Sequence, residues 1–470
     1  MKKHLTLIVL CAISLLHLHA LAQEPVKPCT PSKGYQTRQG LAEGCLASSA
    51  YADLDINNVR ARINASGDHW WDLQGNGQYF IPKNSYKRSM FSSAIWIGGL
   101  SDNGQLKLAA QRYRGDGVDF FPGPLSTDGL AATDAYSCMD WDHVFVFYSR
   151  QVEEFIAAFR EDPSLSKYQV PDFIKNYPAH GDPARLQSFY LAPFYDYDGN
   201  GVYDYTKGDY PYYDFGHQHC NINRPPGLPV ETGMGGSGLL ADQILQGHQT
   251  LWWVFNDNGN LHFETHGEAI GLEIRAQAFA WEGHDELNNA TFYNYEIINR
   301  SNQRLNQTWF GQFADCDLGD AYDDYVGSDV YRGLGYCYNG VDPDGSGRPQ
   351  DYGAQPPAVG VDFYRGPYMD ADGVDNPRYD GFGELVCGYG INGSNFSDGI
   401  IDNERYGMCH FVYFNGLGGF WGMTAPGEAQ EYYNFLRGIW KDGERMKYWG
   451  NVHPMAGGNG PECRFMFPGD

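Results

Sequence analysis

The segment from residue 196 to residue 209 carries the densest set of side chains that could bind a metal ion. Its oxygen-bearing candidates are Asp196, Asp198, Asn200, Asp204 and Asp209. Calcium prefers several hard oxygen ligands, and alternate positions of a tight loop deliver them. An EF-hand loop would have a bidentate Glu where this chain has Lys207, so we expect Asp209 or a distant residue to supply the last oxygens. The spacing therefore predicts a structural Ca²⁺ site, and an ion-free polar turn is the alternative.

Two further acidic segments are weaker candidates for the same chemistry. They contain Asp315, Asp317, Asp320, Asp323 and Asp324 in the first, and Asp370, Asp372 and Asp375 in the second. Carboxylates crowded into so few positions repel one another, and a cation would neutralise them. Smaller acidic turns at 342–347 and 398–404 have the same character. Each of these segments is interpreted either as an ion-binding loop or as a solvated turn.

The sequence contains none of the common catalytic signatures. No HExxH, GxSxG or P-loop occurs. The His-Gln-His-Cys segment at 217–220 lacks the distant partners that a transition-metal site needs. Carboxylate pairs for glycoside hydrolysis stay open, because the two acids need not be neighbours in sequence. A binding or structural role is therefore favoured over an enzymatic one, and a secreted hydrolase acting on polysaccharide is the alternative.

The charge balance restricts the class of partner. The chain has 58 acidic and 33 basic residues, a formal net charge of −25 at pH 7. So negative a chain is repelled by nucleic acids and by anionic membranes, which excludes both as partners. Aromatic residues make up 15% of the chain, which suits a large core and also a surface for contact with a glycan or another protein.

The first residues predict export. Lys2 and Lys3 precede an apolar run over 5–16, and an A-x-A cleavage site ends at Ala22. The apolar run is too short for a lasting membrane anchor, and no other stretch is apolar enough to span a bilayer. We therefore expect residues 1–22 to be a signal peptide. The mature chain would be secreted or displayed on the outer cell surface, without a transmembrane segment.

The cysteines that follow the apolar run fit an exported protein, in which cysteines commonly form disulfides. They are Cys29, Cys45, Cys138, Cys220, Cys316, Cys337, Cys387, Cys409 and Cys463. Pairing of neighbours would give Cys29–Cys45, Cys316–Cys337 and Cys387–Cys409, although sequence does not determine connectivity. The odd count leaves one thiol free or paired beyond Asp470, and the absence of CxxC disfavours a zinc ribbon.

Short aromatic segments separated by polar turns predict a mainly β protein. The expected strands span 91–97, 106–113, 250–255, 262–265, 271–281, 291–299 and 308–314. Helical periodicity is confined to 150–161 and 427–441. The regular spacing of the strands favours antiparallel β-sandwich parts, of the jelly-roll or immunoglobulin-like kind, with a few short helices.

Glycine and proline near 225–245 suggest a boundary between two parts. We expect a linker at 23–50 and an N-terminal β-rich domain with the calcium loop at 51–230. A β-sandwich region at 240–470 would follow and would be truncated at its C-terminus.

Longer stretches carry a more specific resemblance. They are Leu54 to Ala61 (LDINNVRA), Met90 to Gly99 (MFSSAIWIGG), Tyr177 to Asp182 (YPAHGD), Leu191 to Pro211, Asp285 to Arg300, Asp315 to Gly340, Pro356 to Pro367, Tyr432 to Gly443 and Phe465 to Asp470 (FMFPGD). In these stretches, and over nearly all of 50–470, the chain resembles the large cell-surface proteins of bacteria that use the type IX secretion system. The resemblance implies a long exported chain with a β-rich N-terminal region, further β-sandwich repeats and a C-terminal sorting domain.

The sorting domain is missing here, so the resemblance implies that this chain is the N-terminal part of a longer type IX-secreted protein. Adhesion is the function that the family suggests. The combined expectation is a secreted or surface-displayed, calcium-binding protein of structural or adhesion type, with a glycan or a protein on a surface as its partner.

Overall fold

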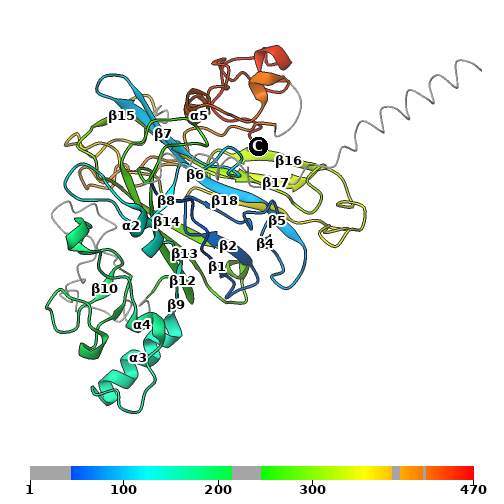
Figure 1. Ribbon diagram of the computed structural model, residues 1–470. Helices are drawn as coiled ribbons and strands as arrows, with labels where there is room; N and C mark the ends of the chain where they lie inside the picture. Colours follow the sequence, from blue (N-terminus) through cyan, green and yellow to red (C-terminus); the bar gives the residue numbers. More distant parts are fainter. Residues whose placement is uncertain (1–43, 214–244, 384–391, 416–419, 470) are drawn as a thin grey trace, which may run out of the picture. The chain divides into compact units, whose positions relative to one another are not determined.

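The computed structural model describes residues 44–213, 245–383, 392–415 and 420–469, whose strands form antiparallel sheets (Figure 1). Strands dominate and helices are few and short, which confirms the fold class expected from the sequence. In these four ranges, no helix combines the length and the apolar character needed to cross a membrane.

The largest sheet has eight strands and is built around β6. Its strands are β1 (Tyr51–Leu54), β2 (Arg60–Asn64), β3 (Asp68–His69), β4 (Tyr79–Phe80), β5 (Arg88–Met90), β6 (Ser92–Ser101), β7 (Leu106–Ala110) and β15 (Leu305–Asp315). β6 pairs with β15 and also with β3 and β7. The turn between β6 and β7 lies where Asp102-Asn103-Gly104 predicts it, with Gly104 at φ +78°.

The second sheet has five strands, and the buried strand β12 pairs with three of them. Its strands are β8 (Phe121–Pro122), β9 (Phe145–Tyr148), β12 (Gln249–Asn256), β13 (Leu272–Ala280) and β14 (Phe292–Asn299). β12 pairs with β13, β8 and β9. Every residue of β12 is buried, which explains why this segment reads as a continuous apolar run and not as an alternating one.

The two sheets share one core because alternate residues of their strands point to opposite faces. Ile97 of β6 and Trp253 of β12 belong to the same buried cluster between the sheets. Their neighbours Trp96 and Trp252 belong to two other clusters, one on the outer face of each sheet. The result is a β-sandwich with a further apolar layer on both sides.

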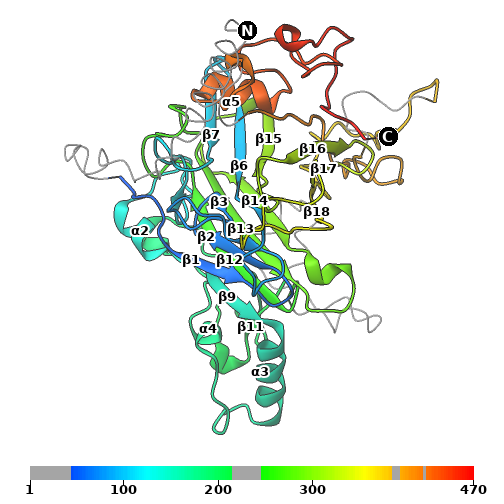
Figure 2. The same cartoon turned by 90° about the vertical axis from the view of Figure 1, so that its right-hand side faces the viewer.

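Helices supply those outer layers. α3 (Ser149–Glu161) and α4 (Asp172–Lys175) pack on the outside of the five-stranded sheet, next to β9. α5 (Ala429–Leu436) packs on the outside of the eight-stranded sheet, against β6 and β7. Figure 2 shows α3 and α4 near β9, and α5 near β6 and β7. α2 (Ala135–Asp140) lies beside β8.

The two large sheets interleave early and late parts of the chain. β15 lies in the sheet that begins with β1, and β8 and β9 lie in the sheet of β12. The described residues accordingly belong to one compact unit. Strands from both sides of the expected division near 225–245 bury their apolar faces in the same core. Most of 225–245 lies outside the described residues.

Two predicted elements need correction. The expected strand at 262–265 is irregular, because its backbone N–H groups bond to Val118 and to the carboxylate of Asp119 and not to a neighbouring strand. The expected helix at 427–441 ends at Leu436, because Gly438 adopts a left-handed φ of +67° that terminates it. The helix predicted at 150–161 is confirmed as α3.

Two disulfides are present among the described residues. Cys316–Cys337 confirms one predicted pair. The predicted pairing of Cys45 with Cys29 is wrong, because Cys45 bonds to Cys138, with their Cα atoms 5.7 Å apart. This bond lies in a small buried cluster that includes Cys138 of α2. The two cysteines are far apart in sequence, so pairing of neighbouring cysteines could not predict the bond. Cys29, Cys220 and Cys387 lie outside the described residues, so the suggested Cys387–Cys409 bond does too.

Candidate metal centre

The loop at 196–209 is closed by a short hairpin. β10 (Phe194–Tyr195) pairs with β11 (Tyr210–Pro211) in the antiparallel sense. The rings of Tyr195 and Tyr210 are stacked, with centroids 4.8 Å apart. Asp196 directly follows β10 and Asp209 directly precedes β11, so strand pairing places these two acids opposite each other at the neck of the loop.

Three carboxylates converge inside this loop. One oxygen each of Asp196, Asp198 and Asp209 lies within 4.8 Å of the other two. Asp209 is fully buried and Asp196 nearly so, whereas Asp198 is exposed. Among the described residues, none of the three makes an ion pair with a Lys, Arg or His. The loop therefore gathers negative charge and oxygen ligands without a protein cation to balance them.

Backbone N–H groups orient these carboxylates. Asp196 accepts hydrogen bonds from the N–H groups of Gly199, Asn200 and Gly201 at 2.8, 3.2 and 2.6 Å. Gly199 and Gly201 have φ values of +74° and +77°, which an L side chain rarely adopts. The glycines in the predicted motif thus allow the chain to wrap around Asp196.

The buried member of the group has a shifted pKa. Burial raises the pKa of Asp209 to about 6, and the charges of Asp196 and Asp198 add to the rise. Hydrogen bonds from the N–H groups of Asp204 and Tyr197, at 2.7 and 2.8 Å, act in the opposite direction. A cation at this position would relieve the same repulsion that now favours the protonated form.

Two predicted ligands of this loop are engaged elsewhere. The carboxylate of Asp204 caps the short 3₁₀ helix Tyr205–Lys207 by accepting from Thr206 N at 2.9 Å. The side-chain oxygen of Asn200 accepts from Val202 N at 2.6 Å. The structure therefore brings together Asp196, Asp198 and Asp209, while Asn200 and Asp204 shape the loop around them.

A residue that the sequence did not point to also holds this loop. His180 lies between two backbone groups: its Nδ1 is 2.9 Å from Phe189 O, and its Nε2 accepts from Tyr203 N at 2.8 Å. This pattern requires the neutral tautomer with hydrogen on Nδ1, and burial lowers the pKa of His180 in agreement. No sequence signal links His180 to the loop, because the contact depends on the folding of the intervening segment.

The first of the other acidic segments finds partners within the protein. Asp317 forms an ion pair with Arg88 at 2.9 Å, and Asp320 forms one with Arg348 at 2.8 Å. Asp315 accepts a hydrogen bond from Tyr113 at 2.7 Å, and burial raises its pKa to about 7. Arg88, Arg348 and Tyr113 come from distant segments. The two arginines partly neutralise the carboxylates, a role that the sequence analysis gave to a bound metal ion.

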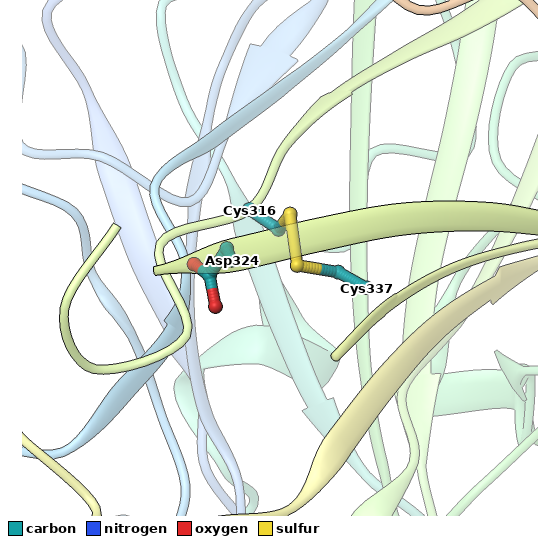
Figure 3. A group of neighbouring side chains, drawn as sticks. All are labelled: Cys316, Asp324 and Cys337. Carbon is teal, nitrogen blue, oxygen red and sulfur yellow. A yellow bond between two sulfur atoms is a disulfide. The ribbon is translucent and has the colours of Figure 1, made fainter. Parts of the chain in front are cut away.

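Asp323 and Asp324 complete that segment. Asp324 lies beside the Cys316–Cys337 disulfide, as Figure 3 shows, with one oxygen within 4.8 Å of both sulfurs. The sulfurs are bonded to each other, so they present no thiolate to a metal. One oxygen each of Asp323 and Asp324 is buried without a hydrogen-bond partner. Burial, and then the charge of Asp323, raises the pKa of Asp324 to about 7.

The remaining acidic segment folds onto one of the smaller acidic turns. Asp402 accepts hydrogen bonds from the N–H groups of Asp372 and Gly373 at 2.8 and 2.9 Å. Asp375 accepts from Gly399 N at 2.7 Å. Asp370 is exposed. In the described ranges, neither this segment nor 315–324 gathers three carboxylates as closely as the 196–209 loop does.

Two open pockets among the described residues each have a volume of about 290 Å³. The first is lined by Asp128 and Asp134 together with Arg185 and Ser137. Hydrogen bonds, led by those from Ser126 and from Ser137 N respectively, lower the pKa values of the two acids. A glycosidase general acid needs a raised pKa, so nothing in this pocket favours hydrolysis.

Comparison of the chain with protein-family models, curated proteins and solved structures found no match.

Proposed function

We propose that this chain is an exported structural or adhesion-type protein of the cell surface, and that Ca²⁺ bound by Asp196, Asp198 and Asp209 stabilises its β10–β11 loop. The observation that carries the proposal is the convergence of these three carboxylates within 4.8 Å at the neck of a hairpin. Carboxylate oxygens are ligands that calcium prefers, and the loop brings three carboxylates together.

Export is supported by the N-terminal pattern of charge and apolar residues and by the two disulfides. The resemblance to type IX-secreted surface proteins supports the same location, and extracellular calcium reaches the concentrations that weak loop sites need. The calcium is proposed as a structural ion: Asp209 and most of Asp196 are buried, so the ion would link β10 to β11 rather than meet a substrate.

Thermal melting of the chain at neutral pH, in calcium and after removal of calcium with EGTA, tests the proposal. Ion binding to the folded state alone raises stability by about 2.7 kcal/mol when the free ion is a hundredfold above its Kd. We expect a higher melting temperature in calcium, and Asp198→Ala should abolish most of the difference. Asp102→Asn, which alters another exposed Asp in a turn, is the matched control and should respond as the parent does.

An unchanged melting temperature after chelation would contradict the proposal. If the parent and Asp198→Ala lose the same stability on chelation, the ion lies at another site. The carboxylates of 315–324 and 370–375 would then be the next candidates. Terbium luminescence sensitised by the nearby tyrosines distinguishes these cases, since Asp198→Ala should reduce the signal only if the ion lies in the 196–209 loop.

The adhesion part of the proposal concerns the surface. Large aromatic side chains project into solvent, among them Tyr322, Tyr331, Tyr364 and Phe382. Such rings suit contact with a glycan or with another protein. A glycan array probed with the calcium-loaded chain tests adhesion. Glycan binding that falls on removal of calcium would show that adhesion depends on the bound ion. A reducing-sugar assay on the same glycans tests the hydrolase alternative.

A further inference from the structure

A three-stranded antiparallel sheet, seen in Figure 2, is fixed to the rest of the protein by one of its faces. Its strands are β16 (Asp324–Asp329), β17 (Leu334–Asn339) and β18 (Ala358–Asp362), with β17 in the middle. Val359 and Val361 of β18 pack against the core cluster between the large sheets. Cys337 of β17 is buried and bonded to Cys316. Because side chains alternate between the two faces of a strand, the residues between these positions point outward.

Three tyrosines occupy the outward face. Tyr325 of β16 lies directly opposite Tyr338 of β17, and Tyr336 lies two residues before Tyr338 on the same face. Tyr325 is 59% exposed and Tyr338 is 43% exposed. On the other flank, Ala358 and Gly360 of β18 pair with Tyr338 and Tyr336. Neither of these small residues can cover a ring, so the aromatic surface stays open on that flank.

Glycines beneath two of the rings let them lie flat. The ring of Tyr336 covers Gly327, its partner across the strands, where a Cβ would lie 2.5 Å from the ring. The ring of Tyr325 covers Gly340 in the same way. The planes of Tyr325 and Tyr338 differ by 28° with centroids 6.1 Å apart, and those of Tyr336 and Tyr338 differ by 38° with centroids 6.0 Å apart. The three rings therefore form a shallow, nearly flat array.

A structural role accounts for only part of this array. An aromatic ring over a glycine supports a sheet where the glycine has no side chain to pack, and this explains Tyr325 and Tyr336. The partners of Tyr338 are Tyr325 and Ala358, neither of which is a glycine. A contact at the surface explains why the ring of Tyr338 is exposed beside the other two.

Acidic residues end the aromatic array. Beyond Tyr336, the next outward row of partners consists of Asp329, Leu334 and Asp362. Asp329 forms an ion pair with Arg332, whereas Asp362 is exposed. Carboxylate oxygens accept hydrogen bonds from hydroxyl groups. Their charge, added to the net charge of −25, disfavours an anionic ligand.

The chemistry of this face matches a sugar ring better than a protein side chain. One face of a pyranose presents C–H groups, which the electron-rich face of an aromatic ring attracts, and its hydroxyl groups donate hydrogen bonds at the rim. The side chains that anchor protein partners fill pockets, and neither of the two open pockets is lined by a residue of β16, β17 or β18. A neutral glycan is therefore the partner that this face fits.

We propose that Tyr325, Tyr336 and Tyr338 form a glycan-binding platform, on which pyranose units of a neutral polysaccharide stack. The inference rests on the proposed adhesion function and gives it a site and a class of ligand. The Cys316–Cys337 disulfide and the packing of β18 on the core hold the sheet in place before the ligand arrives. Binding therefore requires little ordering of the protein, which favours affinity.

Affinity electrophoresis of the full chain in calcium tests the platform, with β-glucan, galactomannan and dextran as neutral probes and polygalacturonate as the anionic probe. We expect at least one neutral probe, and not polygalacturonate, to retard the parent. Tyr325→Ala and Tyr338→Ala should each weaken that binding by up to about tenfold, and the double variant should abolish it. Tyr136→Ala removes an exposed ring from α2, outside this sheet, and should bind as the parent does.

Thermal melting shows whether each variant folds. Ala358→Arg is the second route if an alanine variant does not, because it keeps all three rings and places a long side chain beside Tyr338 from the edge strand β18. It should also weaken binding of the neutral probe. A folded Ala358→Arg variant that binds as the parent does would contradict the platform.

Equal binding by the parent and the double variant would overturn the platform and leave adhesion at another site. Retardation by polygalacturonate as strong as by the neutral probes would overturn the class of ligand. A parent that no neutral probe retards would overturn the platform and glycan adhesion together, whereas the calcium site is tested separately by melting. In that case, a dimer of the parent that the double variant loses would assign the face to contact between protein chains.

Discussion

Asp196 and Asp209 face each other at the neck of the β10–β11 hairpin, with ligand oxygens within 4.8 Å. The pairing of Tyr195 with Tyr210 fixes this approach, because the two acids are the next residues beyond the paired strands. Repulsion between them is the clearest electrostatic cost in the loop, and a cation or a proton would each remove it. Calcium and protons should therefore compete for this position.

The competition predicts how calcium stabilisation depends on pH. The pKa of Asp209 is raised from 3.8 to about 6. In metal-free protein the protonated Asp209 therefore contributes to stability fully below pH 3.8, and this contribution is lost as the pH rises through about 6. Calcium binds the ionised form, so its effect should grow over the same interval. Melting in metal-free buffer and in calcium, at pH 5 and pH 7.5, should show a larger difference at pH 7.5.

Asp209→Asn is the control for that experiment, since its side chain cannot ionise and is a weaker ligand. It should reduce the calcium effect at pH 7.5, and in metal-free buffer it should remove the part of the pH dependence of stability that Asp209 contributes. A calcium effect that is equal at the two pH values would show that Asp209 does not take part.

The glycines of the loop provide a matched pair of variants. Gly199 and Gly201 both have left-handed φ values, so Ala at either position should cost about 1–2 kcal/mol of folding free energy. A Cβ at Gly199 would meet nothing within 4 Å, whereas a Cβ at Gly201 would lie 2.7 Å from the Tyr190 hydroxyl. Gly201→Ala should therefore weaken calcium binding and lower the melting temperature more than Gly199→Ala does. Calorimetric titration measures calcium binding and thermal melting measures stability, and equal effects of the two variants would contradict the packing argument.

The disulfide Cys45–Cys138 should contribute more to stability than Cys316–Cys337. The bonds close sequence separations of 93 and 21 residues, for which chain entropy predicts about 4.6 and about 3.3 kcal/mol. Replacing each pair by Ala and measuring denaturant unfolding tests the order. Peptide mapping without reduction checks the connectivity. A fragment that links Cys45 to Cys29 would show that the Cys45–Cys138 bond is incorrect.

Loss of the buried ion pair between Arg114 and Asp68 should lower the free energy of unfolding strongly. Asp68 is fully buried and accepts hydrogen bonds from Arg114 at 2.8 Å and from Gln111 at 2.6 Å. Arg114→Met would leave a buried charge without its partner and should cost about 3–5 kcal/mol. Arg62→Met, which removes the more exposed pair with Asp53, should cost about 1 kcal/mol or less. Denaturant unfolding measures both losses. If the two variants lose the same free energy of unfolding, burial does not determine how much each ion pair contributes to stability.

The local sequence pattern was sufficient to predict those structural features that depend on a few neighbouring residues. The periodicity of Val152, Phe155, Ile156 and Phe159 predicts α3, because residues at this spacing share one face of a helix. The turn at Asp102-Asn103-Gly104 predicts the β6–β7 hairpin in the same way. The alternation of Asp196, Asp198 and Asn200 before Gly201 indicates a tight, oxygen-lined loop, since a glycine is required where φ is positive.

Contacts between distant segments were decided only by the tertiary structure. Pairing of β10 with β11 brings Asp209 to Asp196, whereas Arg88 and Arg348 take up Asp317 and Asp320. The interleaving of early and late strands in both sheets, and the bond of Cys45 to Cys138, have the same origin. The physical reason is that such contacts follow from how the whole chain buries its apolar faces. Acidic segments that read alike in sequence therefore differ in whether a protein cation, a hydroxyl or only other carboxylates meet them.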